Sequence, residues 1–152
     1  MKQTLQLKND RREVAGLAAW LDRFARANAL SDQVRGNLQV ALEEVALNVI
    51  THGYGEGGEQ RSFSVTLEIE GDFVSVIVTD SAEAYDPTRH SELDITLPLE
   101  QRPIGGIGVH LVKNLMETVG YKRSDGQNVL TLRCRWKDAE CAPRDETTVP
   151  KT

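Results

Sequence analysis

The stretch ALEEVALNVITHGYGEGG, residues 41–58, decides how the rest of this chain is interpreted. It completes a helical pattern that begins after Ser31, a residue type suited to capping the N-terminus of a helix. Apolar residues recur in this pattern at the spacing of one helix face: Val34, Leu38, Ala41, Leu42, Val45 and Val49. Because glycines occupy positions 55, 57 and 58, we expect the helix to end near His52 and Gly53.

Glu44 and Asn48 stand one turn apart in this helix, about 40° apart around its axis. Asn48 falls at the edge of the apolar stripe and is expected to be substantially buried, whereas Glu43 points to the opposite side as a solvated charge. An amide oxygen suits a hard cation such as Mg2+, and a carboxylate suits a general base. A solvated glutamate beside a helix-edge asparagine would give the same pattern, so these two residues alone do not establish a site.

The neighbouring segments predict a strand and a helix before this stretch and two strands after it. Residues 3–8 alternate as in a short strand, and Asn9-Asp10 then offers a cap for a helix. The apolar face of that helix comprises Val14, Leu17, Ala18, Leu21, Phe24 and Ala25. The alternating residues 63–69 and the β-branched run 73–78 predict two strands joined by a turn at residues 70–72.

Periodicity is lost from Asp80 to Pro103, where prolines interrupt any long element. A segment of this length without secondary structure is usually a functional lid or is disordered. A third helix is expected to begin after residues 105–108 and to run to about Val119, followed by a hairpin of residues 119–124 and 128–136 around Asp125-Gly126. Residues 137–152 are polar and predict a frayed tail.

This order of elements favours an α+β fold, because hairpins and helices come in separate blocks. We expect a two-layer sandwich in which helices cover one face of a mixed, mainly antiparallel sheet. A doubly wound parallel sheet would alternate strand and helix more strictly. The chain of 152 residues suits one domain, which we assign to residues 1–136.

Composition and charge exclude several classes of protein. With 39% hydrophobic and 27% charged residues and only two cysteines, the chain is neither disordered throughout nor a disulfide scaffold. A net charge of -5 argues against nucleic acid as the main partner. No apolar run reaches the roughly 20 residues that span a bilayer, and the N-terminus lacks the apolar centre of a secretion signal. We therefore expect a cytoplasmic protein without a nucleic-acid or membrane partner.

Two further segments carry groups suited to binding a nucleotide. Gly105, Gly106 and Gly108 leave backbone amides unobstructed at the start of a helix, where phosphate is favoured. Their spacing matches neither the Walker pattern nor the dinucleotide fingerprint, and flexible helix entries look the same. Asp80 ends a strand and suits an exocyclic base amine, although turn-forming aspartates are common at such places. The three histidines lie in separate segments and do not make a metal site.

The order and separations of these motifs are specific. The series Glu44-x-x-x-Asn48, Asp80 and Gly105-Gly-Ile-Gly108 resembles the ATPase superfamily of gyrase-type topoisomerases, histidine kinases and MutL. Within this superfamily the chain is similar to the small anti-sigma-factor serine kinases of the RsbW and SpoIIAB type. Residues 44–54, 102–116 and 128–132 carry the resemblance, which extends over nearly the whole chain up to about residue 136.

The resemblance implies a Bergerat-type site for ATP and Mg2+. Asn48 would hold Mg2+ against the phosphates, and Glu44 would act as the base toward the attacking hydroxyl. Asp80 would hydrogen-bond the adenine amine, and Thr131 matches the position that supports Asp80 and the base. The lid over the triphosphate would comprise Gly105, Gly106, Gly108 and Lys113.

One position departs from the family's pattern. The first glycine box usually runs Asp-x-Gly, and this chain has Asp80-Ser81-Ala82. Alanine is small enough for close approach of the base, but it adopts positive φ less readily than glycine does. We therefore expect Ala82 to give either a different loop or a lower nucleotide affinity.

As a member of this branch, the protein would be a cytoplasmic serine kinase that phosphorylates a STAS-domain antagonist in a partner-switching system. It would also bind a sigma factor or a similar target. The family tends to be dimeric, while the sequence itself leaves the oligomeric state open.

Other functions remain as alternatives. The main one is a regulator with the same fold that sequesters its partner without phosphorylating it. A detached histidine-kinase ATP domain is disfavoured, because the first 30 residues contain no histidine for phosphotransfer. A purely structural protein would leave the ordered series of motifs unexplained.

Overall fold

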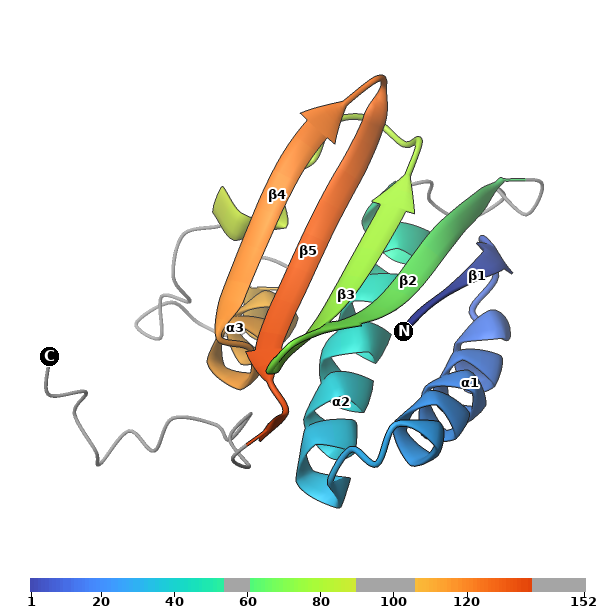
Figure 1. The fold of residues 1–152 in the computed structure, drawn as a ribbon. Coiled ribbons are helices and arrows are strands. Elements are labelled where there is room, and N and C mark those ends of the chain that lie inside the picture. Colours follow the sequence, from blue (N-terminus) through green and yellow to red (C-terminus); the bar gives the residue numbers. More distant parts are fainter. Residues whose placement is uncertain (54–60, 90–105, 138–152) are drawn as a thin grey trace, which may run out of the picture.

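The computed structural model describes residues 1–53, 61–89 and 106–137. The strands are β1 (Lys2–Lys8), β2 (Ser62–Glu70), β3 (Phe73–Asp80), β4 (Thr118–Ser124) and β5 (Gln127–Arg135). The helices are α1 (Glu13–Ala27), α2 (Asp32–Asn48) and α3 (Gly106–Leu115), with a π-helical turn η1 (Val49–Gly53) and a 3-10 turn η2 (Pro87–Arg89). The predicted order of elements is therefore confirmed (Figure 1).

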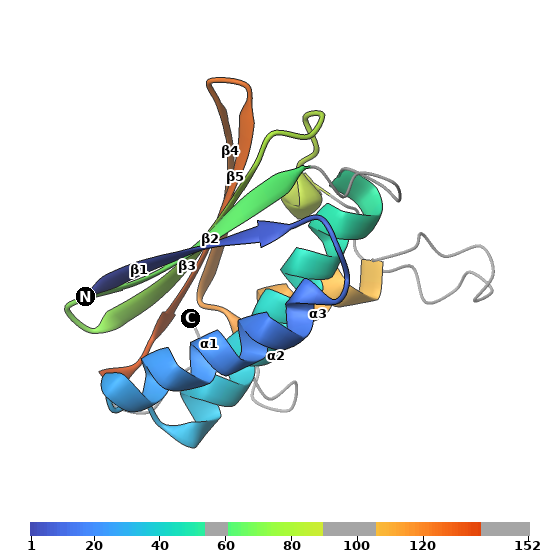
Figure 2. The same cartoon turned by 90° about the vertical axis from the view of Figure 1, so that its right-hand side faces the viewer.

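The strands form one five-stranded sheet with the order β1-β2-β3-β5-β4. Every described pairing between neighbours is antiparallel, so the sheet is antiparallel rather than mixed. The three α-helices lie on one face of the sheet, as Figure 1 and Figure 2 show from two directions. The expected two-layer α+β sandwich is thus confirmed, and none of the described elements covers the other face of the sheet.

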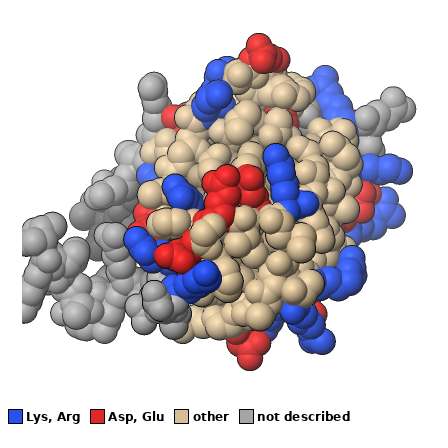
Figure 3. Space-filling model, viewed as in Figure 1, with Lys and Arg blue, Asp and Glu red and all other residues tan. Residues whose placement is uncertain are grey.

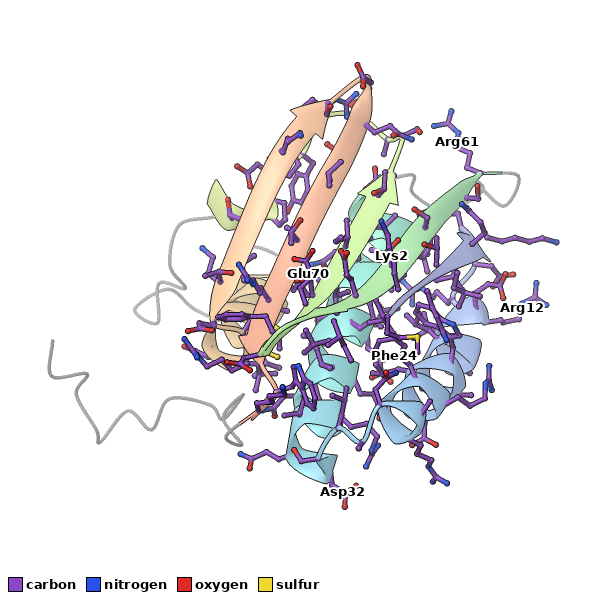
Figure 4. All side chains as sticks on the ribbon, in the orientation of Figure 1. Lys2, Arg12, Phe24, Asp32, Arg61 and Glu70 are labelled. Atoms are coloured by element: carbon purple, nitrogen blue, oxygen red, sulfur yellow. The ribbon has the colours of Figure 1, made fainter. Side chains whose placement is uncertain are left out.

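Side-chain alternation along the strands builds the core between the two layers. The inward residues of β2 and β3 are buried: Phe63, Val65, Leu67, Val74, Val76 and Val78. They pack against the apolar faces of α1 and α2, and Figure 4 shows Phe24 lying between α1 and the sheet. The intervening residues of each strand lie on the uncovered face.

Helix α2 begins and ends where the sequence predicts. Ser31 is its N-cap, and the Ser31 Oγ accepts a hydrogen bond from the Val34 backbone N–H at 3.1 Å. After Asn48 the backbone continues as the π-helical turn η1 to Gly53. Turns of this kind are frequent at functional sites, and this one follows directly on Asn48.

Two helix boundaries differ from the prediction. Helix α1 starts at Glu13 after Arg12, which provides no side-chain cap, so the predicted cap at Asn9-Asp10 is wrong. Asp10 instead closes a turn, since its Oδ1 accepts a hydrogen bond from the Arg12 backbone N–H at 2.9 Å. Hydrogen bonds from the Arg12 side chain and backbone also lower the pKa of the Asp10 carboxyl. Helix α3 ends at Leu115 rather than near residue 119, because residues from 118 onward pair with β5.

Replacing Ser31 with alanine should lower the free energy of unfolding by about 1 kcal/mol, because the Val34 N–H loses its capping acceptor. Ser31→Asp keeps an acceptor at the cap and should remain within about 0.5 kcal/mol of wild type. Urea unfolding followed by circular dichroism measures both variants. An equal loss of stability in the two would contradict the capping role.

Candidate functional site

A pocket of about 620 Å3, measured to its open mouth, lies between the helices and the end of the sheet where β3 terminates. Its walls are mainly apolar: Val45, Val49, Val78, Val112, Val119 and Leu130. Polar groups are few and converge from different elements: Asn48, Asp80, Thr88 and Asn128, with Tyr85 and Tyr121 beside them. A mostly apolar wall with a few placed polar groups is typical of a small-molecule site.

Asp80 is the acidic group of this pocket. It is the last residue of β3 and is only 8% exposed. Its Oδ1 accepts hydrogen bonds from the Ala82 backbone N–H at 3.0 Å and from the Asn128 Nδ2 at 2.9 Å. Because both of these bonds fall on Oδ1, the Oδ2 of Asp80 is left to accept a hydrogen bond from a ligand.

Asn128 holds Asp80 in place, and sequence reasoning missed it. The two residues are opposite each other in β5 and β3, and Asn128 is buried. Its Nδ2 also donates to the Glu83 carbonyl at 2.9 Å, while its Oδ1 accepts from the Tyr121 hydroxyl and from the Arg123 Nη1 at 3.1 Å. The bonding capacity of Asn128 is therefore used within the protein, and its bond to Asp80 fixes the position of that carboxylate. A polar residue in the inward series 128, 130, 132 and 134 was the available signal.

Thr131 does not support Asp80, contrary to the expectation from the resemblance. Along β5, residues 128, 130, 132 and 134 are buried toward the helices, so Thr131 lies on the uncovered face. Its neighbours in register are Ile77 of β3 and Gly120 of β4. The supporting role expected of Thr131 belongs to Asn128.

Helix α2 presents Asn48 to the pocket, between Val45 and Val49. Asn48 is half-buried, as its position at the edge of the apolar stripe predicts. Glu44 stands one turn earlier and is also half-buried, but it is not part of the pocket wall. Glu43 is half-buried too, and its Oε1 accepts a hydrogen bond from Gln39 Nε2 at 3.4 Å.

The loop after β3 is held by hydrogen bonds of the Ala82 backbone, which do not require a glycine at this position. Ala82 is 2% exposed, its N–H donates to Asp80, and its carbonyl accepts from the Arg123 Nη1 at 2.8 Å. Among the described non-glycine residues, positive φ occurs at Ala29 and Asp125, so Ala82 has an ordinary backbone conformation. The loop therefore does not require the glycine that the family's pattern has at this position.

The turn η2 and helix α3 meet at the rim of the pocket. Lys113 on α3 donates from Nζ to the Thr88 carbonyl at 2.9 Å, and Asp86 Oδ1 accepts from the Thr88 backbone N–H at 2.8 Å. Burial raises the pKa of Tyr85, whose phenol is neutral at physiological pH. Lys113 is exposed, so its charge stands at the edge of the pocket rather than inside it.

Of the three glycines proposed for the phosphate lid, two belong to the described residues. Gly106 and Gly108 lie in the first turn of α3, so this helix starts within the glycine segment rather than after it. Gly105 lies outside the described residues. The positions of Gly106 and Gly108 agree with a helix start next to the pocket, since Val112 of the same helix lines it.

Two features are absent from the part of the chain that the structure describes. No helix in residues 1–53, 61–89 or 106–137 is long and apolar enough to cross a membrane. The same residues contain no group of three or more His, Cys, Asp and Glu side chains that could hold a metal ion.

Fold and pocket together define a domain that binds a small molecule through an apolar cleft and a buried carboxylate acceptor. The chain belongs to the histidine kinase-like ATPase domain family, whose model matches residues 7–134. This match extends over most of the described strands and all three α-helices.

Several curated relatives of the chain are protein kinases. It is 29% identical over 129 residues to the serine/threonine-protein kinase BtrW of Bordetella bronchiseptica, covering 85% of this chain and 90% of BtrW. It is 29% identical over 94 residues to the serine-protein kinase RsbW of Halalkalibacterium halodurans, covering 59% of this chain and 56% of that protein. RsbW of Staphylococcus aureus is 24% identical over 110 residues, covering 70% of this chain and 69% of that protein. The resemblance to serine kinases of the RsbW type is therefore confirmed.

A similar fold occurs in the crystal structure of the RsbU and RsbW domains of a Mycobacterium tuberculosis protein. The TM-score is 0.64 at 15% sequence identity, and the match covers 89% of this chain and 32% of that one. At this identity the similarity bears on the fold alone, which it confirms.

Asn128→Ala should lower the free energy of unfolding by about 2 kcal/mol, because Asp80 Oδ1 and the Glu83 carbonyl lose a buried donor. It should also weaken ATP binding about tenfold, since Asp80 loses one of the two bonds that orient it. Chemical unfolding and titration calorimetry measure the two effects. Thr131→Ala, in the same strand but on the other face, is the matched control and should leave ATP affinity unchanged. An equal loss of ATP affinity in both variants would contradict the assignment of the supporting role to Asn128 instead of Thr131.

Ala82→Gly tests whether the loop needs the family's glycine. Because Ala82 is buried with an ordinary φ, the glycine should leave ATP affinity within about twofold of wild type. It should lower the free energy of unfolding by up to about 1 kcal/mol, since glycine has more freedom in the unfolded chain. A clear gain in affinity by calorimetry would mean that alanine does hinder the nucleotide.

Proposed function

We propose that this protein is an ATP- and Mg2+-dependent protein serine kinase that phosphorylates a STAS-domain partner. The observation that carries the proposal is Asp80, a buried carboxylate with one unused oxygen at the end of an apolar pocket. The family and its kinase relatives support the reaction class.

The pocket has the chemistry that an adenine ring requires. Asp80 Oδ2 is an acceptor suited to the exocyclic amine of the base, and a carbonyl at that position, as in guanine, would be repelled. Val78 and Leu130 offer apolar contact on the sheet side, and Val112 adds apolar contact from α3. These walls exclude water around the ring, which strengthens the hydrogen bond to Asp80.

Asn48 is the residue that we assign to Mg2+. Its amide oxygen is a hard ligand on the pocket wall, and Mg2+ commonly takes one or two protein ligands with the remainder from phosphate and water. One amide oxygen from the protein therefore fits a Mg2+ ion whose other ligands would be phosphate oxygens and water. When bound, Mg2+ supplies charge neutralisation for the phosphates.

Glu44 is assigned as the base. It stands one turn from Asn48 and outside the pocket wall, where it is accessible to a hydroxyl of a protein substrate. In the transfer, the serine oxygen forms a bond to the γ-phosphorus, the bond to the bridging oxygen breaks, and ADP leaves. The Glu44 carboxylate, as the general base, takes the proton of the serine hydroxyl. Asp80 meanwhile holds the adenine ring of the nucleotide in place.

We further infer that the protein acts in the cytoplasm within a partner-switching system. In such a system the kinase binds a sigma factor or a similar target, and the STAS-domain protein competes with that target for the kinase. The second candidate function is a regulator that binds the partner without phosphorylating it. Because Glu44 lies outside the pocket wall, its role in phosphate transfer is the point on which the two candidates differ.

Glu44→Gln should reduce phosphate transfer at least about 100-fold, because the amide cannot take the serine proton. Labelled ATP, Mg2+ and the cognate STAS-domain protein are incubated with each variant, and transfer is followed over time. Glu43→Gln, which removes the neighbouring carboxylate, is the control and should transfer at the wild-type rate.

The outcomes of this assay distinguish the two candidate functions. Full transfer by Glu44→Gln would exclude the proposed base. No transfer by wild type, together with retained partner binding by calorimetry, would select the regulator that only sequesters its partner.

A further inference from the structure

One row of polar side chains crosses three strands at the end of the sheet where β3 terminates, which is uppermost in Figure 1. Asp80 of β3 is opposite Asn128 of β5, and Asn128 is opposite Arg123 of β4. An acidic, an amide and a basic side chain are therefore neighbours in this row. Arg123 follows Val119 and Tyr121 at alternate positions of β4, and both of these residues line the pocket. Arg123 thus belongs to the same face of the sheet but lies beyond the pocket wall.

One nitrogen of Arg123 bonds to both of the residues that hold Asp80 in place. Its Nη1 donates to the Ala82 carbonyl at 2.8 Å and to the Asn128 Oδ1 at 3.1 Å. The Ala82 N–H and the Asn128 Nδ2 in turn donate to Asp80 Oδ1, at 3.0 and 2.9 Å. Loss of the Arg123 side chain would therefore loosen both supports of the carboxylate at once.

Arg123 also determines which way the Asn128 amide faces. The amide Oδ1 accepts hydrogen bonds from the Tyr121 hydroxyl, from Arg123 Nη1 and from the Tyr85 backbone N–H, the last at 3.3 Å. A tyrosine hydroxyl can donate or accept, so it could bond to either end of the amide, whereas a guanidinium can only donate. The Tyr85 N–H belongs to the loop that Arg123 itself holds. With Oδ1 toward Arg123, the amide presents its Nδ2 to Asp80.

A cation is tolerated at this place because it keeps contact with water. Arg123 is exposed, and Figure 3 shows basic and acidic side chains on the surface at this end of the molecule. Its guanidinium therefore makes two hydrogen bonds without the free-energy cost of burying a charge. Hydrogen bonds from a charged donor are also stronger than those between neutral groups. Arg123 is thus suited to hold the loop and the amide firmly.

We propose that Arg123 is a positioning residue that sets the preference of the site for adenine over guanine. It acts through Ala82 and Asn128, which hold Asp80 Oδ1 and leave Oδ2 to the exocyclic amine of the base. The inference rests on the proposed ATP site and adds a specificity role for a residue outside the pocket wall. Without Arg123 the carboxylate is free to turn, so it selects less strictly against the guanine carbonyl.

Arg123→Met tests this role, because it removes the donors and keeps an unbranched side chain. Its affinity for ATP should fall about fivefold, since Asp80 loses the indirect support of two hydrogen bonds. Its affinity for GTP should change by less than about twofold, because the guanine carbonyl gains nothing from a well-placed carboxylate. Titration calorimetry with ATP and Mg2+, and displacement of ATP by GTP, measure the two affinities. The ratio of the ATP affinity to the GTP affinity should therefore fall.

Lys122→Met is the matched control, because it removes the adjacent cation of β4, which lies on the face away from the helices. It should bind both nucleotides as the wild type does. Chemical unfolding of both variants measures any loss of stability, which by itself would not change the ratio of the two affinities. If Arg123→Met does not fold, Arg123→Thr repeats the comparison with a side chain that favours strands and is too short to reach Ala82.

A double variant tests whether Arg123 acts through Asn128. Combining Arg123→Met with Asn128→Ala should cost about 10- to 20-fold in ATP affinity, rather than the roughly 50-fold expected of independent residues. The reason is that part of the Arg123 effect is already lost when Asn128 is absent. In the phosphate-transfer assay, Arg123→Met should raise the KM for ATP and leave kcat within about twofold of wild type, because Glu44 and Asn48 are untouched.

The outcomes separate this inference from the proposed function. A wild type that prefers ATP over GTP, together with an Arg123→Met variant of unchanged preference, would overturn the role of Arg123 and leave the proposed site intact. Fully independent losses in the double variant, or a fall in kcat without a rise in KM, would also overturn it. A wild type that binds no nucleotide would overturn both the inference and the proposed function.

Discussion

The hydrogen bond from Asn128 Nδ2 to Asp80 Oδ1, 2.9 Å long, is the interaction on which the candidate site depends. It joins two buried residues that are opposite each other in β5 and β3, and further bonds from Asn128 reach the loop after β3 and strand β4. A carboxylate and an amide in an apolar layer are tolerated only when their bonds are made. A slip of one residue between β3 and β5 would turn Asn128 to the other face and leave Asp80 unsupported.

The same alternation gives the sheet two surfaces with different properties. Inward residues of β3 and β5 form the core and end at the pocket with Asp80 and Asn128. Outward residues of the same strands are threonine, serine, isoleucine and valine in the middle, with charges toward one end. Because helices cover only one face, an antiparallel sheet of this kind can place water or a second protein on the other. A nucleotide in the pocket would therefore contact only the inward side of these strands.

Much of the fold and part of the site could be predicted from the sequence. Local periodicity was sufficient for the described strands and helices, and Asn48 and Asp80 could be named from their places at a helix edge and a strand end. For Asn128 the sequence offered only a polar residue in an inward series, and its pairing with Asp80 could not be predicted, because that pairing depends on a register between residues 48 positions apart. The resemblance pointed to Thr131, which the register places on the opposite face. The end of α3 was missed for a related reason, since pairing with β5 takes precedence over the helical pattern from Thr118 onward.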